Sequence, residues 1–435
     1  MNFTESTQYL YSLGNEVSAM KLGLENIRTL LTALGDPQNK YLKVQVAGTN
    51  GKGSVCAFLD SICNTAGIKT GTFTSPHLVS ITERIRINGV DIGEDDFARH
   101  AGIVRETAEN LLEKGELEYR PTFFEQVTAI ALVAFAEAKV EVAILETGLG
   151  GRLDATTAAN AEISAITRID LDHQEYLGNT IEEIAAEKAA IIRADSRVCI
   201  GVQHPAAIGV IMSRCKDVKV RPTTLENAHW VRYALGYDFV LTELSISEVE
   251  IALQGEHQVE NAALAILVVK MLKRFFAISD KHIRSGVVNA RHPGRLEMVK
   301  LSSVHILLDG AHNPAGAETL AAYLRVSDPE AISVALLFGA MDDKDVSAML
   351  SSLVPLATDV ILTEAKNVRS MPAEKIAAAL CREPTLDRVV SVPDLGEALD
   401  LAIEMASSYQ DSRWRLVVVT GSLYLVGEVK KILNN

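Results

Sequence analysis

Residues 42–54 of this 435-residue chain read LKVQVAGTNGKGS. The first five residues are predicted to form a strand, and a helical pattern follows from Ser54 to Thr65. A glycine-rich turn between a strand and a helix lets backbone N–H groups point toward a phosphate, and the helix N-terminus adds positive potential. The candidate nucleotide-binding residues of this turn are Asn50, Gly51, Lys52, Gly53 and Ser54.

The lysine of this turn is the feature that most favours phosphate chemistry. Lys52 can reach the terminal phosphates of a nucleotide, which also makes it a candidate catalytic residue. The spacing differs from the strict G-x-x-x-x-G-K-[ST] motif, so the alternative is a plain glycine-rich strand-to-helix turn. Glycine, lysine and serine together at a strand–helix junction favour the phosphate-binding interpretation.

The alternation of apolar strands and helices extends over most of the chain. Further strands are predicted at 141–146 and 162–167, and helices at 123–138, 180–193 and 258–274. Short apolar strands separated by helices are typical of βαβ units and a largely parallel sheet. Hairpins are predicted at 84–89, where Asn88-Gly89 is a strong turn dipeptide, and at 238–253.

A second domain is predicted after the basic turn RHPGR at residues 291–295. The alternation of strands and helices begins again there. Strands are predicted at 304–308, 332–338, 359–363, 388–392 and 415–419, with a helix between each successive pair. We therefore expect an α/β protein with two domains, 1–296 and 297–435. The first is a P-loop-containing, mostly parallel sheet domain, and the second is a smaller Rossmann-like α/β domain.

Bulk properties narrow the class of protein further. The net charge of −14 argues against a nucleic-acid partner, because that affinity depends on Lys and Arg neutralising phosphates. The five cysteines show no C-x-x-C pair or zinc-ligand spacing, which favours reduced thiols in a reducing compartment. No signal-peptide pattern and no membrane-length apolar run is present, so we expect a cytoplasmic protein with no membrane partner.

A series of further motifs follows the glycine-rich turn. They are TSPHL (74–78), ERIRING (83–89), TFFE (122–125), ETGLGGRLDATT (146–157), DHQEYLG (172–178), EKAAI (187–191), GEHQVENA (255–262), RHPGRLE (291–297), LDGAHNP (308–314), DDKD (342–345) and GSLYLVGE (421–428). In this order the motifs resemble the folylpolyglutamate synthases and dihydrofolate synthases, which belong to the Mur ligase superfamily. The resemblance covers essentially the whole chain.

The resemblance implies a magnesium-dependent reaction with ATP. The candidate metal ligands are Ser54, Ser75, Glu146 and His173. Glu146 ends a predicted strand, where open α/β sheets bind ligands, although a solvated strand-end carboxylate is the alternative. His173 alone would be an unusual magnesium ligand, but the family has a histidine at this place, at a second magnesium. We expect two ions, with His173 also a catalytic candidate.

Lys188 is the third catalytic candidate. It occupies the centre of an apolar helical stripe that continues to Ile191 and Ile192, so its amine should be at least partly desolvated and neutral. A neutral amine can add carbon dioxide to give a carbamate, and the resemblance implies a carbamylated lysine here. Snorkelling of the ammonium to the surface is the alternative. Ala189 stands where the family motif has glycine.

The remaining candidates concern the two organic substrates. The resemblance implies nucleotide contacts from Asn261, Arg295 and Asp309, and His312 could contact phosphates. It also implies pterin contacts from Thr122, Phe123, Phe124, Glu125, Leu153, Asp154 and Ala155. The aromatic pair suits a flat heterocycle, although both rings could instead be core residues. Turn chemistry is the alternative for the Asp-Gly and Asn-Pro pairs at 309–314.

The expected function is an ATP-dependent amide ligase that adds L-glutamate to dihydropteroate, to a reduced folate, or to both. Domain 1–296 would bind ATP and pterin, and domain 297–435 would close on the glutamate and ATP side. We expect a monomer. The alternatives are a Mur-type ligase for peptidoglycan precursors and a P-loop module that binds nucleotide without ligation.

Overall fold

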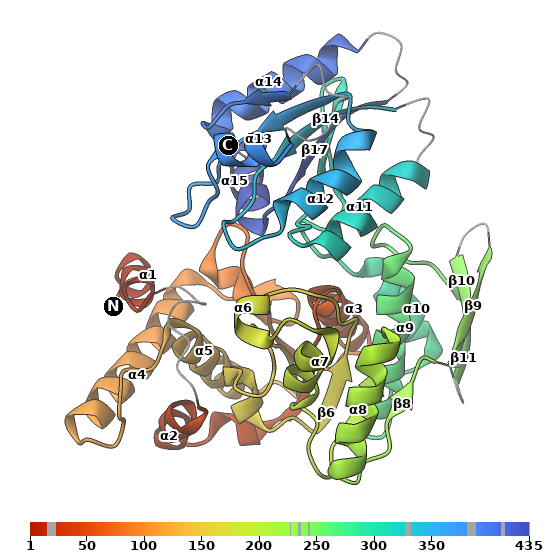
Figure 1. Cartoon of the computed structure of the whole chain (residues 1–435). Coiled ribbons are helices and arrows are strands. Elements are labelled where there is room, and N and C mark those ends of the chain that lie inside the picture. Colours follow the sequence, from red (N-terminus) through yellow and green to blue (C-terminus); the bar gives the residue numbers. More distant parts are fainter. Residues whose placement is uncertain are drawn as a thin grey trace. The chain divides into compact units, whose positions relative to one another are not determined.

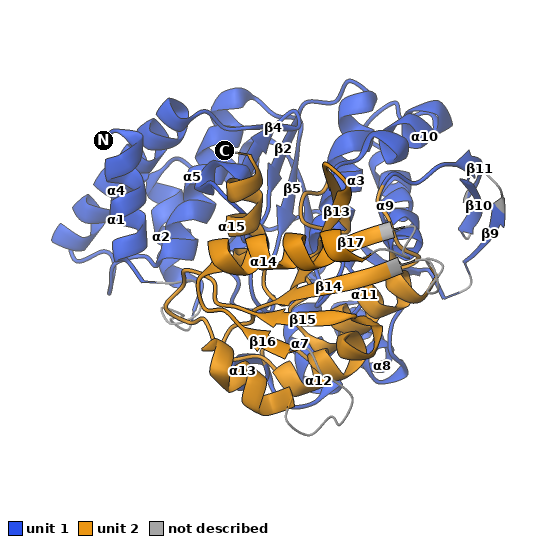
Figure 2. Cartoon of the chain, turned by 90° about the horizontal axis from the view of Figure 1, so that it is seen from above, with its two compact units in different colours: residues 1–170, 174–252, 258–291 blue, residues 171–173, 253–257, 292–435 orange. Residues whose placement is uncertain are grey.

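The computed structural model describes residues 1–14, 23–226, 228–233, 236–241, 244–326, 332–380, 389–409 and 414–434. The chain divides into two compact units, coloured in Figure 2. The first unit comprises residues 1–170, 174–252 and 258–291, and the second comprises residues 171–173, 253–257 and 292–435. The last long stretch of the second unit begins at His292, close to the boundary after Leu296 that the sequence predicts.

The first unit is built on a sheet that has eight strands over the described residues, in the order β4-β3-β2-β5-β1-β6-β7-β8. Strands β6 and β8 of this sheet are labelled in Figure 1. The strands are β1 (Leu42–Ala47), β2 (Thr70–Phe73), β3 (Ile85–Ile87), β4 (Val90–Asp91), β5 (Val142–Glu146), β6 (Ile163–Ile166), β7 (Arg197–Ile200) and β8 (Thr223–Thr224). From β2 to β8 all neighbours pair in parallel, whereas β3 and β4 form the predicted antiparallel hairpin. The mostly parallel sheet is confirmed.

Helices pack on this sheet as βαβ connections require. They are α1 (Phe3–Ser12), α2 (Glu25–Ala33), α3 (Lys52–Thr65), α4 (Glu94–Glu113), α5 (Phe123–Ala138), α6 (Gln174–Leu177), α7 (Ile181–Ala189), α8 (Pro205–Asp217), α9 (His257–Leu272) and α10 (Asp280–Asn289). Ala143 and Leu145 of β5 join a core with α2, α4 and α5, while α3 packs on β1, β2 and β5. Helix α10 in turn packs against α3.

Two local expectations for the first unit need correction. The predicted helix 180–193 ends at Ala189, so Ile191 and Ile192 lie beyond it, although both are fully buried. The predicted hairpin 238–253 is part of a three-stranded antiparallel sheet of β9 (His229–Tyr233), β10 (Gly236–Leu241) and β11 (Leu244–Val249). The pattern missed β9 because its residues HWVRY do not form an apolar run.

The second unit contains a sheet that has six strands over the described residues, in the order β12-β13-β17-β14-β15-β16. The strands are β12 (Glu297–Leu301), β13 (Val304–Leu308), β14 (Ile332–Phe338), β15 (Asp359–Leu362), β16 (Val389–Ser391) and β17 (Trp414–Thr420). Only β12, at the edge, is antiparallel to its neighbour among these strands. The five predicted strands and their order in the chain are confirmed, and β12 is an addition.

The helices of the second unit are α11 (Pro314–Val326), α12 (Val346–Leu353), α13 (Ala373–Leu380), α14 (Leu395–Ser408) and α15 (Leu423–Leu433). Helices α11 to α13 share one apolar core with β13, β14, β15 and β17. Helices α14 and α15 pack on β17 outside that core. Helices therefore cover both faces of this sheet, as expected for a Rossmann-like domain.

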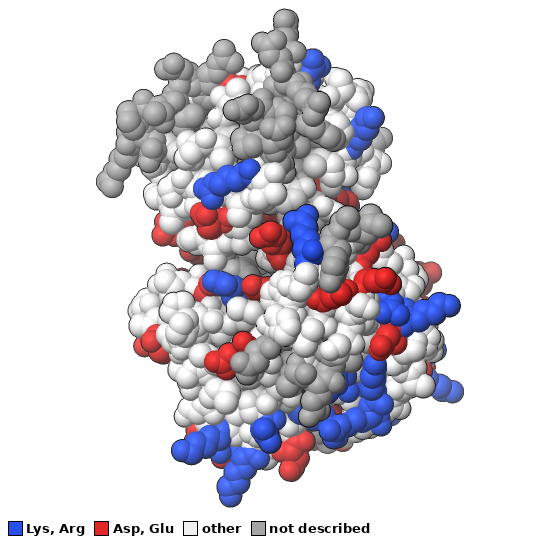
Figure 3. All heavy atoms as spheres, turned by 90° about the vertical axis from the view of Figure 1, so that its right-hand side faces the viewer, with Lys and Arg blue, Asp and Glu red and all other residues white. Residues whose placement is uncertain are grey.

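Three structural observations concern the cysteines, the surface charge and the helices of the chain. Cys56, Cys63, Cys199 and Cys215 are buried and free, whereas Cys381 lies outside the described residues. On the face shown in Figure 3, Lys and Arg side chains are interspersed with Asp and Glu. Within the part of the chain that the structure describes, no helix is both long and apolar enough to cross a membrane.

Candidate functional site

The glycine-rich turn connects β1 to α3, as its sequence predicts. Gly51 caps the N-terminus of α3 with a φ of 90°, a left-handed conformation that favours glycine. Gly48 has a φ of 155°, and a Cβ on it would lie 1.8 Å from the hydroxyl of Thr167. Glycine is therefore required at both positions for the turn to form this cradle for a phosphate.

Helix α9 of the first unit contributes two polar side chains beside this cradle. Gln258 Nε2 donates to Ser54 Oγ at 3.2 Å, and Asn261 Nδ2 donates to Gln258 Oε1 at 3.0 Å. A Cβ on Gly51 would lie 2.3 Å from Asn261 Oδ1. Asn261 therefore lies directly against the turn. Gly51 and Asn261 are about 210 residues apart in the sequence, and the fold brings them together.

A second loop, 168–170, fixes the first part of the turn. The backbone N–H groups of Thr49 and Asn50 donate to the carbonyl of Arg168, at 2.9 and 3.2 Å. Asn50 Nδ2 also donates to Asp170 Oδ2 at 3.2 Å. The side chain of Asn50 is therefore engaged in holding the loop, and Asp170 is a supporting residue that the sequence motifs did not indicate.

Two lysines share one carbonyl oxygen of the turn. Lys188, on α7, donates from Nζ to the Gly48 carbonyl at 2.8 Å, and only 5% of this residue is exposed. Lys52 donates to the carbonyls of Gly48 and Thr49, both at 3.1 Å. The amine of Lys188 lies inside the molecule beside the phosphate cradle, which does not fit the snorkelling alternative.

The ends of β2 and β5 bring two candidate metal ligands together. Glu146, at the last residue of β5, is buried, and its Oε2 accepts a hydrogen bond from the backbone N of Ser75 at 3.2 Å. Burial first, and then the Glu146 carboxylate, raise the pKa of the Cys56 thiol on α3, so this charge lies close to that helix. Ser54, in the first turn of α3, is also buried.

The TFFE segment forms the start of α5. Thr122 caps the helix, and its backbone N and Oγ1 donate to Glu125 Oε2 at 2.8 and 2.9 Å, so this pair forms a capping box. The Phe124 ring lies against Gly148, where an added Cβ would be 2.5 Å from the ring. The aromatic segment therefore reaches the loop that follows Glu146.

That loop, residues 147–157, is organised by Asp154. The buried carboxylate of Asp154 accepts hydrogen bonds from the backbone N of Gly148 at 2.8 Å and of Leu149 at 3.0 Å, and also from Thr156. Burial raises the pKa of this carboxyl, while these hydrogen bonds oppose the rise. Asp154 shapes the loop, and its neighbours Leu153 and Ala155 are half-buried and buried.

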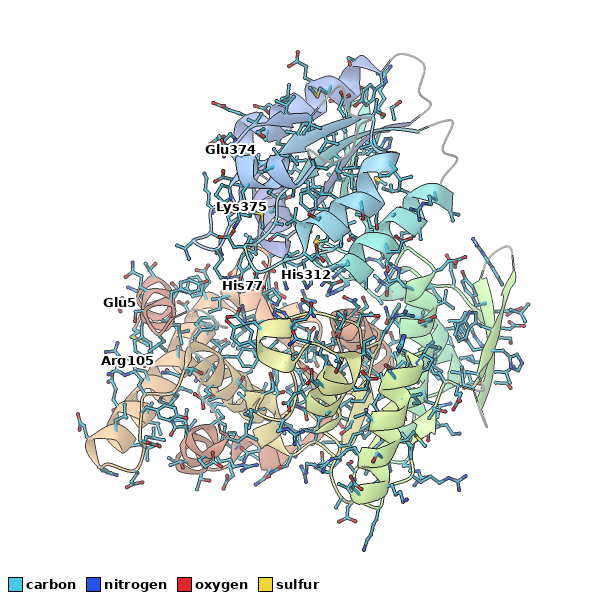
Figure 4. All side chains as sticks on the ribbon, viewed as in Figure 1. Glu5, His77, Arg105, His312, Glu374 and Lys375 are labelled. Carbon is cyan, nitrogen blue, oxygen red and sulfur yellow. The ribbon has the colours of Figure 1, made fainter. Side chains whose placement is uncertain are left out.

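Phe123 faces a different set of groups. Its ring stacks on Tyr11 of α1, with centroids 5.8 Å apart, and the Arg84 guanidinium lies 5.3 Å from its centre. Arg84 Nε donates to His77 Nδ1 at 2.8 Å, and the Tyr11 hydroxyl lies 3.3 Å from His77 Nε2. His77, labelled in Figure 4, comes directly after the TSP segment that carries Ser75. Sequence reasoning missed Tyr11 and Arg84, because neither belongs to a phosphate or metal motif.

In the second unit, three candidates gather at the end of β13. Arg295 Nη1 donates to the Gly310 carbonyl at 3.1 Å. His312, which is labelled in Figure 4, donates from Nδ1 to the same oxygen at 2.8 Å. Asp309 accepts from the backbone N of Leu296 at 2.9 Å. Burial raises the pKa of Asp309, and Arg295 opposes this. Burial lowers the pKa of His312 to about 4, so its ring is neutral at physiological pH.

His173 also belongs to the second unit, on the short segment 171–173. Its backbone is left-handed, with a φ of 50°, and its Nδ1 is buried with no hydrogen-bond partner among the described residues. Burial lowers the pKa of His173 to about 4. A neutral, buried imidazole nitrogen with no partner is chemically suited to bind a metal ion.

Two of the metal ligands proposed from the sequence have atoms of a kind that can bind a divalent metal ion. Glu146 supplies a buried carboxylate, and His173 supplies an unsatisfied nitrogen. Among the described residues, no three His, Cys, Asp or Glu side chains come close enough to hold a metal together. Mg²⁺ at nucleotide sites ordinarily takes only one or two protein carboxylates, with phosphates and water as its other ligands.

Comparisons with known proteins give the family. A model of the Mur ligase middle domain matches residues 46–269, and one of the Mur ligase, glutamate ligase domain matches residues 294–423. The dihydrofolate synthase/folylpolyglutamate synthase of Bacillus subtilis (strain 168) is 35% identical over 424 residues, 95% of either chain. The chain belongs to the folylpolyglutamate synthase/dihydrofolate synthase family.

Solved structures agree with this assignment. Mycobacterium tuberculosis folylpolyglutamate synthase complexed with ADP has a TM-score of 0.92 and 31% identity, over 100% of this chain and 98% of that one. The Yersinia pestis bifunctional folylpolyglutamate synthase/dihydrofolate synthase complexed with AMPPNP and Mn has a TM-score of 0.85 and 28% identity, over 100% and 98%. This member of the family is an ATP-dependent glutamate ligase that acts on folates. The peptidoglycan-ligase and non-ligating alternatives are set aside.

Proposed function

We propose that this ligase joins the amine of L-glutamate to a pterin-bearing carboxylate through an acyl phosphate. A carboxylate oxygen attacks the γ-phosphorus of ATP, the bond to the β-phosphate oxygen breaks, and ADP leaves. The glutamate amine then attacks the acyl carbon, inorganic phosphate leaves, and the amine loses a proton. No side-chain nucleophile is needed, so the residues of the chain bind, orient and neutralise charge.

One observation carries this proposal. The Phe124 ring lies against Gly148, two residues after Glu146, and the backbone N of Ser75 donates to Glu146. An aromatic surface suited to a flat heterocycle therefore adjoins the strand end that carries the candidate metal ligands. The other residues proposed to contact the pterin belong to these two segments. The first segment contains Thr122, Phe123 and Glu125, and the second contains Leu153 and Ala155, with Asp154 shaping its loop. Related crystal structures hold DHPP with ADP, and L-glutamate with AMPPNP and Mn.

For the nucleotide, we assign the phosphates to the N–H groups of residues 51–54, with Lys52 as their cation. Asn50 shapes this turn instead, because its own N–H donates to the Arg168 carbonyl. Lys52 is at present turned onto the Gly48 and Thr49 carbonyls, so its amine must swing to reach a phosphate. Asn261, against Gly51, suits the adenine. In the second unit, Arg295 and His312 suit phosphates, and Asp309 suits the ribose.

Two Mg²⁺ ions would neutralise the charge of the transferring phosphoryl group. Ser54, Ser75 and Glu146 suit one ion, and His173 suits the second. Mg²⁺ prefers oxygen ligands, and Lys188 can supply two more of them as a carbamate. The neutral amine attacks carbon dioxide, an N–C bond forms, and a proton is released. Burial of Lys188 beside the Gly48 carbonyl supports this, because a neutral amine is the reactive form.

Each domain is assigned a part of the reaction. Domain 1–296 binds ATP and pterin, and domain 297–435 serves the glutamate and ATP side, working as a monomer in the cytoplasm. A closed site is needed for this chemistry, because water would otherwise hydrolyse the acyl phosphate.

The test is ADP release measured with ATP and Mg²⁺ in four mixtures. They contain no further substrate, glutamate alone, dihydropteroate with glutamate, and tetrahydrofolate with glutamate. We expect turnover only where glutamate and a pterin carboxylate are both present, and the two complete mixtures show which carboxylate is used. Equal ADP release in all four mixtures would contradict the proposal.

A further inference from the structure

Three of the sequence motifs contain a residue that the proposed reaction does not use, and these residues meet in the second unit. Asp172 comes from DHQEYLG, Asn313 from LDGAHNP and Lys344 from DDKD. Lys344 Nζ lies 2.8 Å from Asp172 Oδ1, and Asn313 Nδ2 donates to Asp172 Oδ2 at 3.0 Å. The side chains of Asp172 and Lys344 are each only 8% exposed.

The buried pair is the centre of a wider polar cluster. His312 Nε2 lies 3.7 Å from Asp172 Oδ2, and Lys344 is also 3.5 Å from Asp343. Removing either member of a buried ion pair leaves the other charge uncompensated, so such pairs are sensitive to single substitutions. The cluster joins the loop after β13, the loop after β14 and the short segment that carries His173.

Asp172 also acts on its neighbour in the chain. Its Oδ1 accepts a hydrogen bond from the backbone N of His173 at 2.9 Å, and its Oδ2 faces His173 Nε2 at 3.9 Å. The backbone of His173 is left-handed, which an L-residue adopts at a cost. The carboxylate lies on the Nε2 side of the ring. The other nitrogen, the buried Nδ1, has no hydrogen-bond partner among the described residues.

Leu171, Asp172 and His173 belong to the second unit, while Asp170 and Gln174 on either side belong to the first. Three residues have little surface with which to hold their place. The contacts of Asp172 with Lys344 and Asn313 tie this segment to the second unit, and the Asp172 carboxylate also accepts from the backbone N of His173.

We propose that Asp172 is a positioning residue for the ligation reaction: held by Lys344 and Asn313, it orients the His173 ring so that Nδ1 is presented to a divalent cation. This rests on the proposed role of His173 as a metal ligand. Carboxylates that orient a metal-binding histidine are a general feature of metal sites, and their loss usually weakens metal binding or activity by about 10–100-fold.

The test uses four variants, Asp172→Asn, Lys344→Met, the double variant and the charge-keeping Lys344→Arg. Lys430→Met is the matched control, because Lys430 forms an ion pair with Glu297 in the same unit, at 2.7 Å, remote in the sequence from the segment. Each protein is measured for kcat, for the KM of ATP, for melting temperature, and for Mn²⁺ affinity by electron paramagnetic resonance with AMPPNP present.

We expect Asp172→Asn and Lys344→Met each to lower kcat and Mn²⁺ affinity by about 10–100-fold, with a much smaller change in the KM of ATP. The double variant should lose no more than the worse single variant, since the two residues act as one unit. Lys344→Arg should keep most of both properties, and Lys430→Met should keep them fully.

Losses that multiply in the double variant, or a lowered melting temperature with unchanged Mn²⁺ affinity, would overturn the proposal and leave a structural ion pair. If Asp172→Asn does not fold, the comparison of Lys344→Met with Lys344→Arg decides by itself. Failure of the proposed function is distinguishable, because the unmodified protein would then show no glutamate-dependent turnover.

Discussion

Replacing Gly51 with alanine tests whether the contact between the glycine-rich turn and α9 belongs to the nucleotide site. Gly51 has a φ of 90°, and an alanine Cβ there would lie 2.3 Å from Asn261 Oδ1. Gly35 is the matched control, because its φ is 80° and an added Cβ would meet nothing within 4 Å. Both substitutions impose left-handed strain, but only Gly51→Ala displaces a neighbouring side chain.

The magnitudes separate the two effects. The left-handed conformation should cost each variant about 1–2 kcal/mol of unfolding free energy. At Gly51 the overlap with Asn261 must be relieved as well, and losing one neutral hydrogen bond to the nucleotide costs about 0.5–1.5 kcal/mol, roughly a 2- to 13-fold weaker affinity. Gly51→Ala should therefore weaken ATP binding by at least this factor, and Gly35→Ala should leave it unchanged.

The assay is calorimetric titration with AMPPNP and Mg²⁺, combined with urea unfolding of all three proteins. The expected result is that both variants lose stability through the left-handed strain, that Gly51→Ala loses more because Asn261 is displaced, and that only Gly51→Ala binds the nucleotide more weakly. An unchanged nucleotide affinity in a folded Gly51→Ala protein would refute the reasoning, since the turn and Asn261 would then not act together on the nucleotide.

Three further outcomes are expected. Arg295→Ala should weaken ATP binding by about 1.5–3 kcal/mol in titration calorimetry, because it removes a charge-assisted phosphate contact, whereas Arg325→Ala, which breaks only an exposed pair, should not. Lys188→Ala should lose activity strongly in steady-state assays and regain part of it with short carboxylic acids, while Lys188→Arg should stay inactive, because arginine cannot form the carbamate. Burial and the nearby Arg295 lower the pKa of His257 from 6.5 to about 4, so the unfolded state binds the extra proton and stability falls as the pH drops from about 6.5 toward 4; the unfolding free energy of His257→Gln should depend less on pH over that interval, and an identical pH profile would contradict this.

The fold was largely predictable, because parallel strands buried on both faces are apolar runs. The five-residue strand β5 (VAILE) and the seven-residue strand β14 (ISVALLF) are examples that the sequence indicates clearly. Strand β12 was not predictable in the same way. It lies at the edge of its sheet, and its residues EMVKL are mostly exposed, so it carries no continuous apolar signal.

A residue of the candidate site was predictable where its local sequence also indicates its environment. The apolar stripe around Lys188 indicates a buried amine, and the amine is buried. What the amine contacts was not predictable, because its acceptor, the Gly48 carbonyl, is 140 residues away in the chain. For the same reason, no local pattern indicates Asp170 beside Asn50 or Gln258 beside Ser54.

The central claim is that ATP activates the pterin-bearing carboxylate as an acyl phosphate, and oxygen-18 in that carboxylate tests it most directly. The labelled substrate is incubated with the enzyme, ATP, Mg²⁺ and glutamate, and the inorganic phosphate is analysed by mass spectrometry. The account predicts that each phosphate released carries one oxygen from the carboxylate, because that oxygen forms the bond to phosphorus and leaves with it. Amide product formed with unlabelled phosphate would contradict the account.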